Sequence, residues 1–179
     1  MTPRAGLLAG DAGPGSPAEA PAHFRRVMGH VPTGVAVVTA LHGGAPAGLT
    51  VGSFTSVSLD PPLVSFTVDR AARSWPSIEA AGAFCVNLLA HDQLHLCRVF
   101  SSRETEKFRG LSWRPAGSGA PIIEGVLAWI DCDVERILGA GDHHLVIGRV
   151  RALDAERPAR PLVFFRGGYG SVESAELAR

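Results

Sequence analysis

The sequence predicts a single, mainly β domain, an antiparallel β-barrel capped by short helices. Three observations support this prediction. The 179 residues are enough for one domain of ordinary size and too few for two catalytic domains. About seven short segments, valine-rich or alternating in polarity, are separated by turns rich in glycine and proline. They do not alternate regularly with helices, as the β-α-β units of a parallel sheet would require.

Three short helices are expected. The first covers about residues 24–31, ends before Pro32 and packs on the core through an apolar stripe. A second begins after a capping Ser74 and ends near Gly82, and a third covers about residues 91–100. The stripe of the first helix has the spacing i, i+3, i+4, i+7 and consists of Phe24, Val27, Met28 and Val31.

The strands are expected where β-branched residues are frequent or polarity alternates. The first two form a hairpin around residues 42–46, and a polar excursion over residues 101–119 follows the third helix. The fifth strand alternates, so that Asp131, Asp133 and Glu135 share one face, which we interpret as solvated. The expected strands are residues 35–41, 47–55, 63–68, 83–89, 126–134, 145–150 and 162–165.

The composition excludes several classes of function. Hydrophobic residues make up 46% of the chain, which is sufficient for a core without disulfides or a structural metal. The 17 basic and 17 acidic residues give a formal net charge of zero, so a nucleic-acid partner is disfavoured. No apolar run approaches the roughly 18 residues that cross a bilayer, so we expect no membrane partner.

The cysteines indicate a reducing compartment. Cys85, Cys97 and Cys132 are odd in number and none lies in a C-x-x-C pair, so we expect reduced thiols that lie mostly in the core. Residues 4–9 form too short an apolar run for a secretory signal. Both observations predict a cytoplasmic protein.

Residues 1–22 differ in composition from the rest of the chain. They are mostly alanine, glycine and proline, and the prolines interrupt any helix, so we expect a disordered tail. A G-x-G-x-x-A pattern over residues 13–18 has no strand before it and has prolines where its loop and helix should be. We therefore interpret this match to a dinucleotide-binding motif as accidental.

Familiar catalytic signatures are missing. The chain contains no G-x-x-x-x-G-K-S/T phosphate loop, no G-x-S-x-G nucleophile elbow and no H-E-x-x-H zinc helix, which disfavours kinase and hydrolase functions. His91 and His95 stand four residues apart, but a zinc site requires three or four ligands. We interpret both as surface histidines and expect no metal site.

The segment of residues 48–58 is the first candidate binding site. Small hydroxyl residues and glycines recur where an apolar strand is expected, which leaves space beside the strand. A flat polar ligand would find hydroxyl and backbone groups there, and Gly48 and Gly52 would let it approach the main chain. A Ser/Thr-rich edge strand also accounts for this composition. The hydroxyl residues concerned are Thr50, Ser53, Ser56 and Ser58.

Three later segments add polar groups. Residues 69–74 place two arginines just before a helix N-terminus at Ser74, an arrangement suited to a phosphate. Residues 141–144 group an acid with two imidazoles where a barrel opens, which is consistent with metal binding or with stacking on a substrate. Arg166 and Tyr169 lie among glycines on a pliable loop.

In their order along the chain, these segments resemble the short-chain flavin reductases that serve two-component flavin-dependent monooxygenases, in the FMN-binding split-barrel superfamily. The most specific motifs are S-F-T-S-V-S-L-D-P-P at residues 53–62 and G-D-H at residues 141–143. The reductases of steroid-ring and phenol hydroxylase systems look most similar. The matches cover about residues 23–172, which we take as the domain, followed by a C-terminal tail at residues 173–179. The other matching segments are F-R-R-V (24–27), P-T-G-V-A-V-V-T (32–39), R-S-W (73–75), F-C-V-N-L (84–88), K-F (107–108), P-I-I-E-G (121–125) and P-L-V-F-F-R-G-G-Y (161–169).

The resemblance implies a six-stranded Greek-key barrel, usually a homodimer, with FMN or FAD in a groove near the subunit boundary. It also implies NADH or NADPH as the hydride donor, with His143 as the catalytic residue that meets the nicotinamide and Arg166 and Tyr169 closing over it. For the flavin it implies Thr50, Val51, Gly52 and Ser53 at the ring, Ser58 and Asp69 along the ribityl chain, and Arg73 and Ser74 at the phosphate.

The sequence departs from the family pattern at one of these positions. Many relatives have Ala-Asn or Cys-Gln where this chain has Val51-Gly52, which removes a side-chain hydrogen bond to the flavin. The resemblance does not divide the roles between His143 and His144.

The implied function is hydride transfer from NAD(P)H to FMN or FAD and delivery of the reduced flavin to a partner monooxygenase. Because the flavin supplies the redox chemistry, no covalent nucleophile is needed, which agrees with the missing catalytic signatures. Two alternatives remain because a fold does not determine a function. One is a flavoprotein that retains its flavin and acts on an organic substrate, and the other is a non-catalytic flavin- or haem-binding protein.

Overall fold

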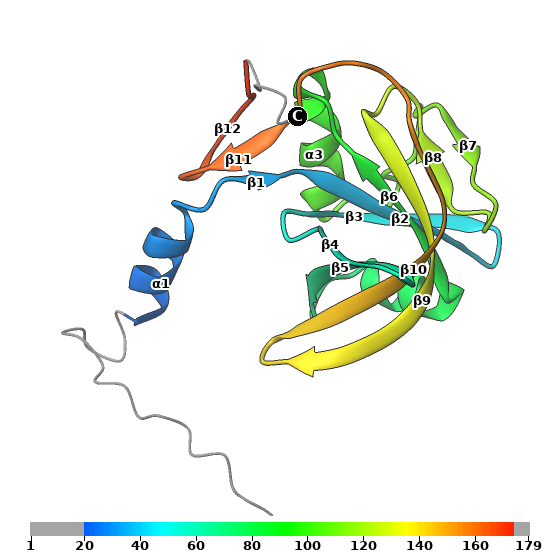
Figure 1. Ribbon diagram of the computed structural model, residues 1–179, viewed down its shortest axis with the longest axis horizontal. Helices are drawn as coiled ribbons and strands as arrows, with labels where there is room; N and C mark the ends of the chain where they lie inside the picture. Colours follow the sequence, from blue (N-terminus) through cyan, green and yellow to red (C-terminus); the bar gives the residue numbers. More distant parts are fainter. Residues whose placement is uncertain (1–19, 174–179) are drawn as a thin grey trace, which may run out of the picture.

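A curved sheet of seven antiparallel strands forms the body of the protein (Figure 1). The computed structural model describes residues 20–173. The sheet curls on itself, since its edge strand β3 also contacts β5, and this confirms the predicted antiparallel barrel. In spatial order the strands are β3 (Ala45–Val51), β2 (Ala36–His42), β6 (Ala83–Leu88), β9 (Ala128–Ala140), β10 (His143–Ala155), β5 (Pro62–Asp69) and β4 (Thr55–Leu59).

A second, three-stranded sheet and one helix project from the barrel, and we call this part the arm (Figure 1). The arm comprises residues 20–34 and 163–170. Its sheet has the order β1-β11-β12, and backbone hydrogen bonds from Val35 to Leu162 and from Leu162 to Leu89 join its base to the barrel. Its elements are α1 (Ala20–Met28), β1 (Thr33–Gly34), β11 (Val163–Phe165) and β12 (Gly168–Gly170).

The first helix does not pack on the core as predicted. α1 starts at Ala20, inside the expected tail, and projects away from the barrel, so its apolar stripe remains exposed instead of packing on the core. Phe24 is 65% exposed and Val27 is 51% exposed. The i, i+3, i+4, i+7 spacing correctly predicts an apolar face, but it does not say what covers that face. The rest of the predicted tail, with the accidental G-x-G-x-x-A pattern, lies outside the described residues, as do residues 174–179.

The other helices lie close to their predicted positions. α2 (Trp75–Ala81) ends at Gly82, whose left-handed conformation (φ 66°) closes the helix, whereas Ser74 makes no capping hydrogen bond with its side chain to any described residue. The third expected helix divides into a 3₁₀ turn, η1 (His91–Gln93), and α3 (Leu94–Ser101). None of the helices within residues 20–173 is long and apolar enough to span a membrane.

The polar excursion contains a small hairpin that was not predicted. β7 (Trp113–Pro115) and β8 (Pro121–Ile123) pair in register, with Trp113 opposite Ile123. The turn between them folds over β9, and this contact explains a wrong prediction about Asp131. Its carboxylate is fully buried rather than solvated.

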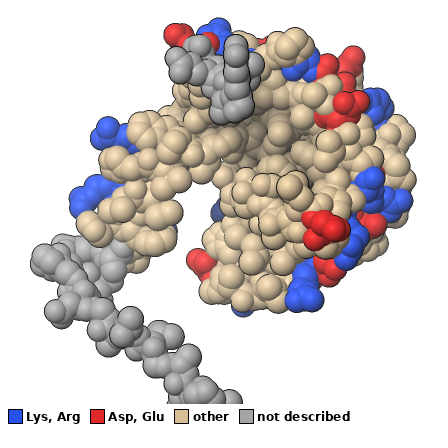
Figure 2. Space-filling view, viewed as in Figure 1, with Lys and Arg blue, Asp and Glu red and all other residues tan. Residues whose placement is uncertain are grey.

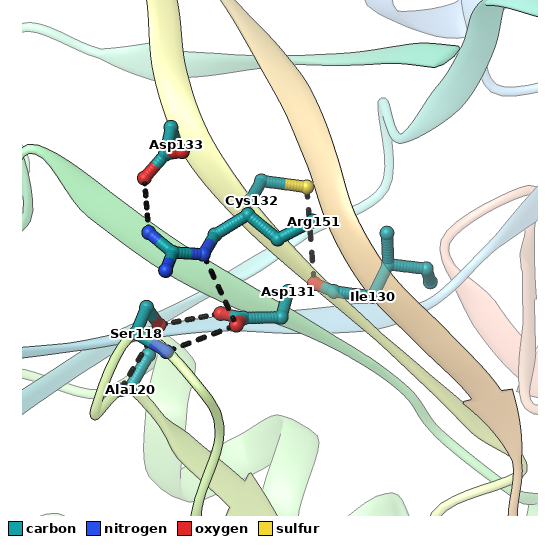
Figure 3. Close-up of polar contacts among 7 residues, drawn as sticks. All are labelled: Ser118, Ala120, Ile130, Asp131, Cys132, Asp133 and Arg151. Carbon is teal, nitrogen blue, oxygen red and sulfur yellow. Dashed lines mark hydrogen bonds and ion pairs between the residues drawn. The ribbon is translucent and has the colours of Figure 1, made fainter.

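Figure 3 shows the hydrogen bonds and the ion pair that the buried Asp131 carboxylate makes. Its carboxylate accepts hydrogen bonds from Ser118 N, at 3.0 Å, and from Ser118 Oγ. Arg151 Nε lies 3.9 Å from the same carboxylate, while Arg151 Nη1 reaches Asp133 at 2.8 Å. Asp133 and Glu135 are exposed or partly exposed and pair with arginines, which agrees with the predicted solvated face.

Aromatic rings fill the barrel interior. Phe66 meets Phe84 edge-on with ring centroids 5.3 Å apart, and Trp75 meets Phe66 at 6.5 Å. Gly148 on β10 allows Phe84 to lie against the backbone, since a Cβ atom there would be 2.4 Å from Phe84 Cζ. The three cysteines are free and buried, as predicted. Burial raises the pKa of Cys132 to about 12 and that of Cys85 still further, so neither thiol is a ready nucleophile.

Candidate functional site

A groove of about 1090 Å³ lies between the arm and the barrel. Figure 2 shows the surface hollowed there, between the projecting helix and the barrel. The barrel contributes residues 49–53, 67–69 and 71–74, together with residues 100–103 after α3. The arm contributes the opposite wall through Phe24, Arg25, Met28, Gly29, Val31, Thr33, Phe164 and Gly167.

Most of the predicted site residues line this groove. They come from three separate segments of the chain, and the β10–β5 register brings two of those segments together by placing His143 directly opposite Asp69. The predicted residues found in the lining are Thr50, Val51, Gly52, Ser53, Asp69, Arg73, Ser74 and His143.

Three predicted residues do not line the groove of a single chain. Ser58 pairs with Leu63, which is six residues along β5 from Asp69, or roughly 20 Å in an extended strand. Arg166 occupies the β11–β12 turn with φ 50°, next to Gly167, which does line the groove. The hydroxyl of Tyr169 instead contacts Cys97 Sγ at 3.4 Å.

The two histidines of the G-D-H-H segment point to opposite faces of β10, as alternate residues of a strand must. His143 faces the groove, whereas His144 stacks on Trp75 with ring centroids 5.6 Å apart and an interplanar angle of 29°. His143 therefore belongs to the site, and His144 packs against the start of α2.

Two of the hydroxyl groups that suggested a binding strand, those of Thr50 and Ser53, are already engaged within the protein. Thr50 Oγ1 donates to Cys97 O at 3.1 Å and ties β3 to α3. Ser53 Oγ accepts a hydrogen bond from Thr67 N at 2.9 Å and donates to Thr67 O at 3.2 Å. This wall therefore offers a ligand mainly its backbone. Gly52 permits a close approach on the arm side too, since a Cβ atom there would be 3.0 Å from Thr33 Oγ1.

The end of the groove near α2 and α3 is cationic. Arg73, Arg103 and Lys107 all line it, and Arg73 Nη1 lies 3.5 Å from Arg103 O. Lys107 Nζ donates to Phe100 O at 2.9 Å and to Gly48 O at 3.3 Å, which leaves one of its three donors for a ligand. Burial lowers the pKa of Lys107 from its usual value. Sequence reasoning missed Lys107 and Arg103 as site residues, although K-F at residues 107–108 was among the matching motifs.

The groove also carries an imidazole held by a carboxylate. His143 Nδ1 lies 2.7 Å from Asp142 Oδ1, and the hydrogen bond from His143 lowers the pKa of Asp142. Because an ionised carboxylate only accepts hydrogen bonds, Nδ1 carries the proton and Nε2 is the free ring nitrogen. Within residues 20–173, no three His, Cys, Asp or Glu side chains converge as a metal site would require.

Residues 28–173 of the chain match the model of the flavin reductase like domain, and this match decides the family. The chain belongs to this flavin reductase family. It is therefore a flavin oxidoreductase, and the barrel with its arm is the split-barrel fold that the sequence predicted.

Curated relatives agree with this assignment. The chain is 55% identical over 151 residues to a flavin reductase of Pseudomonas putida, covering 84% of this chain and 89% of that protein. It is 43% identical over 166 residues to the flavin-dependent monooxygenase reductase subunit HsaB of Rhodococcus jostii, covering 93% of this chain and 85% of the relative.

Solved structures of flavin reductase family members share the fold. A nitrilotriacetate monooxygenase component B homologue from Mycobacterium thermoresistibile superposes with a TM-score of 0.86 at 45% identity, covering 92% of this chain and 95% of the other. The NADH:FAD oxidoreductase SgcE6 of Streptomyces globisporus, solved in complex with NAD and FAD fragments, gives a TM-score of 0.80 at 34% identity, with coverages of 89% and 96%.

The groove suits the two ligands that a flavin reductase uses, a flavin and a nicotinamide nucleotide. Its volume of about 1090 Å³ reaches the upper end of the 300–1,000 Å³ that is usual for small-molecule sites, which gives room for two ring systems. The spare Lys107 donor, together with Arg73 and Arg103, fits a phosphate. The backbone wall at residues 50–53 fits a flat, polar ring.

Proposed function

We propose that this chain is an NAD(P)H-dependent flavin reductase that transfers a hydride to FMN or FAD and passes the reduced flavin to a separate flavin-dependent monooxygenase. The observation that supports this most strongly is the polarity of the groove. Three cations, a histidine held by a carboxylate and an accessible backbone line the same groove.

The positive charge of the groove is the reason for placing the phosphate-bearing flavin there. Arg73, Ser74 and Lys107 hold the phosphate, Asp69 lies along the ribityl chain, and the ring rests on the backbone of residues 50–53. Asp69 is held in place for this role, since its Oδ1 accepts a hydrogen bond from Ala71 N at 2.7 Å. When bound, the flavin supplies the redox chemistry, so the chain itself needs no nucleophile.

His143 positions the nicotinamide. The Asp142 carboxylate fixes the imidazole through Nδ1, and Nε2 remains to meet the donor nucleotide. Hydride transfer requires the two reacting atoms to lie roughly 3 to 3.5 Å apart, so small displacements of this ring weaken catalysis.

We infer a homodimer that covers the apolar side of the arm. Phe24 and Val27 of α1 and Phe165 of β11 are exposed by 65%, 51% and 45%. Exposed large apolar side chains gathered on one projecting element are typical of an interface. A second copy of the chain, related by a two-fold axis, is the commonest partner that supplies a matching surface.

We further infer a cytoplasmic location. The support is the three buried free thiols, which suit a reducing compartment. Reductase subunits of monooxygenases among the relatives support delivery of reduced flavin to an oxygenase as the biological purpose.

The test is steady-state oxidation of NADH and of NADPH with FMN, FAD and riboflavin added one at a time. We expect turnover that depends on added flavin, and a protein that loses flavin on gel filtration. A protein that stays yellow and reduces an organic acceptor without added flavin would instead be a flavoprotein with a retained cofactor. A protein that binds flavin but oxidises neither nucleotide would be a carrier or a sensor.

A further inference from the structure

The tyrosine ring of β12 packs against a residue that lines the groove. The β11–β12 register places Tyr169 directly opposite Phe164, so the two side chains share one face of the arm's sheet. Their rings meet edge-on, with centroids 5.3 Å apart and an interplanar angle of 60°. Phe164 lines the groove on the arm side, whereas Tyr169 lies outside the lining. A displacement of the Tyr169 ring would therefore displace Phe164.

The hydroxyl end of the same side chain reaches α3. The buried Cys97 thiol donates a hydrogen bond to Tyr169 Oη, with Sγ and Oη 3.4 Å apart. The backbone oxygen of Cys97 in turn accepts the hydrogen bond from Thr50 Oγ1 at 3.1 Å. Thr50 lines the groove on the barrel side. Tyr169 thus connects the two walls of the groove, through Phe164 on one side and through α3 on the other.

The contact between Tyr169 and Cys97 differs from the other attachments of the arm. Within residues 20–173, it is the only hydrogen bond from an arm side chain to the barrel or its helices. The base of the arm is held by backbone hydrogen bonds around Val35 and Leu162. The hydrogen bond with Cys97, together with burial, raises the pKa of Tyr169 to about 12, so the phenol stays neutral at physiological pH. The arm is therefore held at a second point, away from its base.

We propose that Tyr169 is a positioning residue, which sets the separation of the two walls of the groove by linking Phe164 to α3. This inference rests on the proposed function, because a flavin and a nicotinamide react only when the walls hold their rings at the distance that hydride transfer requires. The role differs from the one that the family resemblance implies, in which Tyr169 itself closes over the nicotinamide.

Two single variants remove the link from opposite ends. Tyr169→Phe keeps the ring beside Phe164 and removes only the oxygen that accepts from Cys97, and Cys97→Ala removes the donor at a position outside the groove lining. Each should weaken FMN binding and lower kcat for NADH oxidation by about threefold to tenfold, with an unchanged far-ultraviolet circular dichroism spectrum. The double variant should be no worse than either single one, because both substitutions break the same contact.

Two further variants serve as controls. Cys97→Ser keeps a donor at this position, so FMN affinity and kcat should stay within about twofold of the wild type. Cys85→Ala removes another buried thiol, which packs in a separate cluster with Ala120 and Ile122, and it should leave both quantities unchanged. A purely structural role of the Cys97 thiol would lower the melting temperature without changing either quantity.

The variant at Cys97 separates positioning from direct contact with a ligand. If Tyr169→Phe is impaired and Cys97→Ala behaves as the wild type does, Tyr169 touches a ligand itself and the inference is overturned. Wild-type FMN affinity in both single variants, or independent losses that add in the double variant, would also overturn it. Because titration with FMN, followed by flavin fluorescence, needs no turnover, it tests the link even if the wild type oxidises neither NADH nor NADPH. That last result would count against the proposed function alone.

Discussion

At the scale of single residues, His143 is the group whose loss should separate catalysis from flavin binding. His143→Ala removes the imidazole from the groove but leaves Arg73, Arg103 and Lys107 in place. We expect kcat/KM for the nucleotide to fall by about tenfold to a hundredfold, equal to about 1.4 to 2.7 kcal/mol. Steady-state kinetics with varied NADH, together with flavin titration, measures both effects.

Flavin affinity is the internal control of that experiment and should change far less than kcat/KM. Normal turnover by His143→Ala would contradict the assigned role. Chelators should also leave activity unchanged, because hydride transfer between a nicotinamide and a flavin needs no Lewis acid. Activity that disappears with a chelator and returns with zinc would place His143 and His144 in a metal site instead.

The Asp131 side chain should contribute far more to the free energy of unfolding than that of Asp133, which lies two residues along β9. Asp131→Ala leaves the partly buried Ser118 groups without their acceptor and removes the buried partner of Arg151, so unfolding should become easier by about 2–4 kcal/mol. Asp133→Ala breaks only a surface ion pair with the same arginine and should change stability by less than about 1 kcal/mol. Urea denaturation of both variants measures the difference, and equal losses would contradict this account of Figure 3.

The sequence predicted which residues line the groove better than it predicted which chemical groups those residues offer to a ligand. Of the segment at residues 48–58, which glycines and hydroxyls marked as a candidate binding wall, residues 49–53 line the groove. The hydroxyls of Thr50 and Ser53, however, bond to backbone atoms of α3 and β5, and such long-range partners leave no local signal. Lys107 was missed for the same reason, since only the fold brings it to Gly48 and Phe100.

At the scale of elements, β10 packs against the barrel interior because Gly148 has no side chain. Gly148→Ala places a methyl group 2.4 Å from Phe84 Cζ, so the ring or the strand must shift. We expect a loss of about 1–3 kcal/mol in unfolding free energy, measured by thermal or denaturant unfolding. Gly170→Ala on β12 is the control, since no atom lies within 4 Å of the added carbon there. Similar effects of the two substitutions would refute the packing argument.

Strands of middle length were predictable because each carries its own pattern, whereas β9 and β10 extend five to six residues beyond the ends of the predicted segments. Strands β2, β5 and β6 lie within one or two residues of the predicted segments. β4 was missed because it is short, exposed and mostly serine and threonine, and β1 has only two residues. The outward direction of α1 was also unpredictable, because an amphipathic helix does not indicate whether its own chain covers its apolar face.

At the scale of the whole molecule, the arm should hold two copies together. Val27→Glu adds a charge to the exposed stripe of α1 without altering a residue that lines the groove. We expect the dimer to dissociate into monomers at micromolar concentration, as observed by sedimentation velocity. Val57→Glu on β4 is a matched control, since Val57 is 52% exposed and lies outside the arm. A wild-type protein that sediments as a monomer would overturn the proposed dimer.

The central claim is that the groove between arm and barrel holds the flavin that the enzyme reduces, and titration of Ser53→Leu with flavin tests it most directly. The leucine fills the groove at residues 50–53 and removes both hydrogen bonds to Thr67. Ser56→Leu, at an exposed position outside the groove, makes the same exchange as a control. We predict that Ser53→Leu, with a far-ultraviolet circular dichroism spectrum like that of the wild type, loses flavin binding and NAD(P)H oxidation, whereas Ser56→Leu keeps both. A folded Ser53→Leu variant that binds flavin with wild-type affinity would contradict the placement of the site.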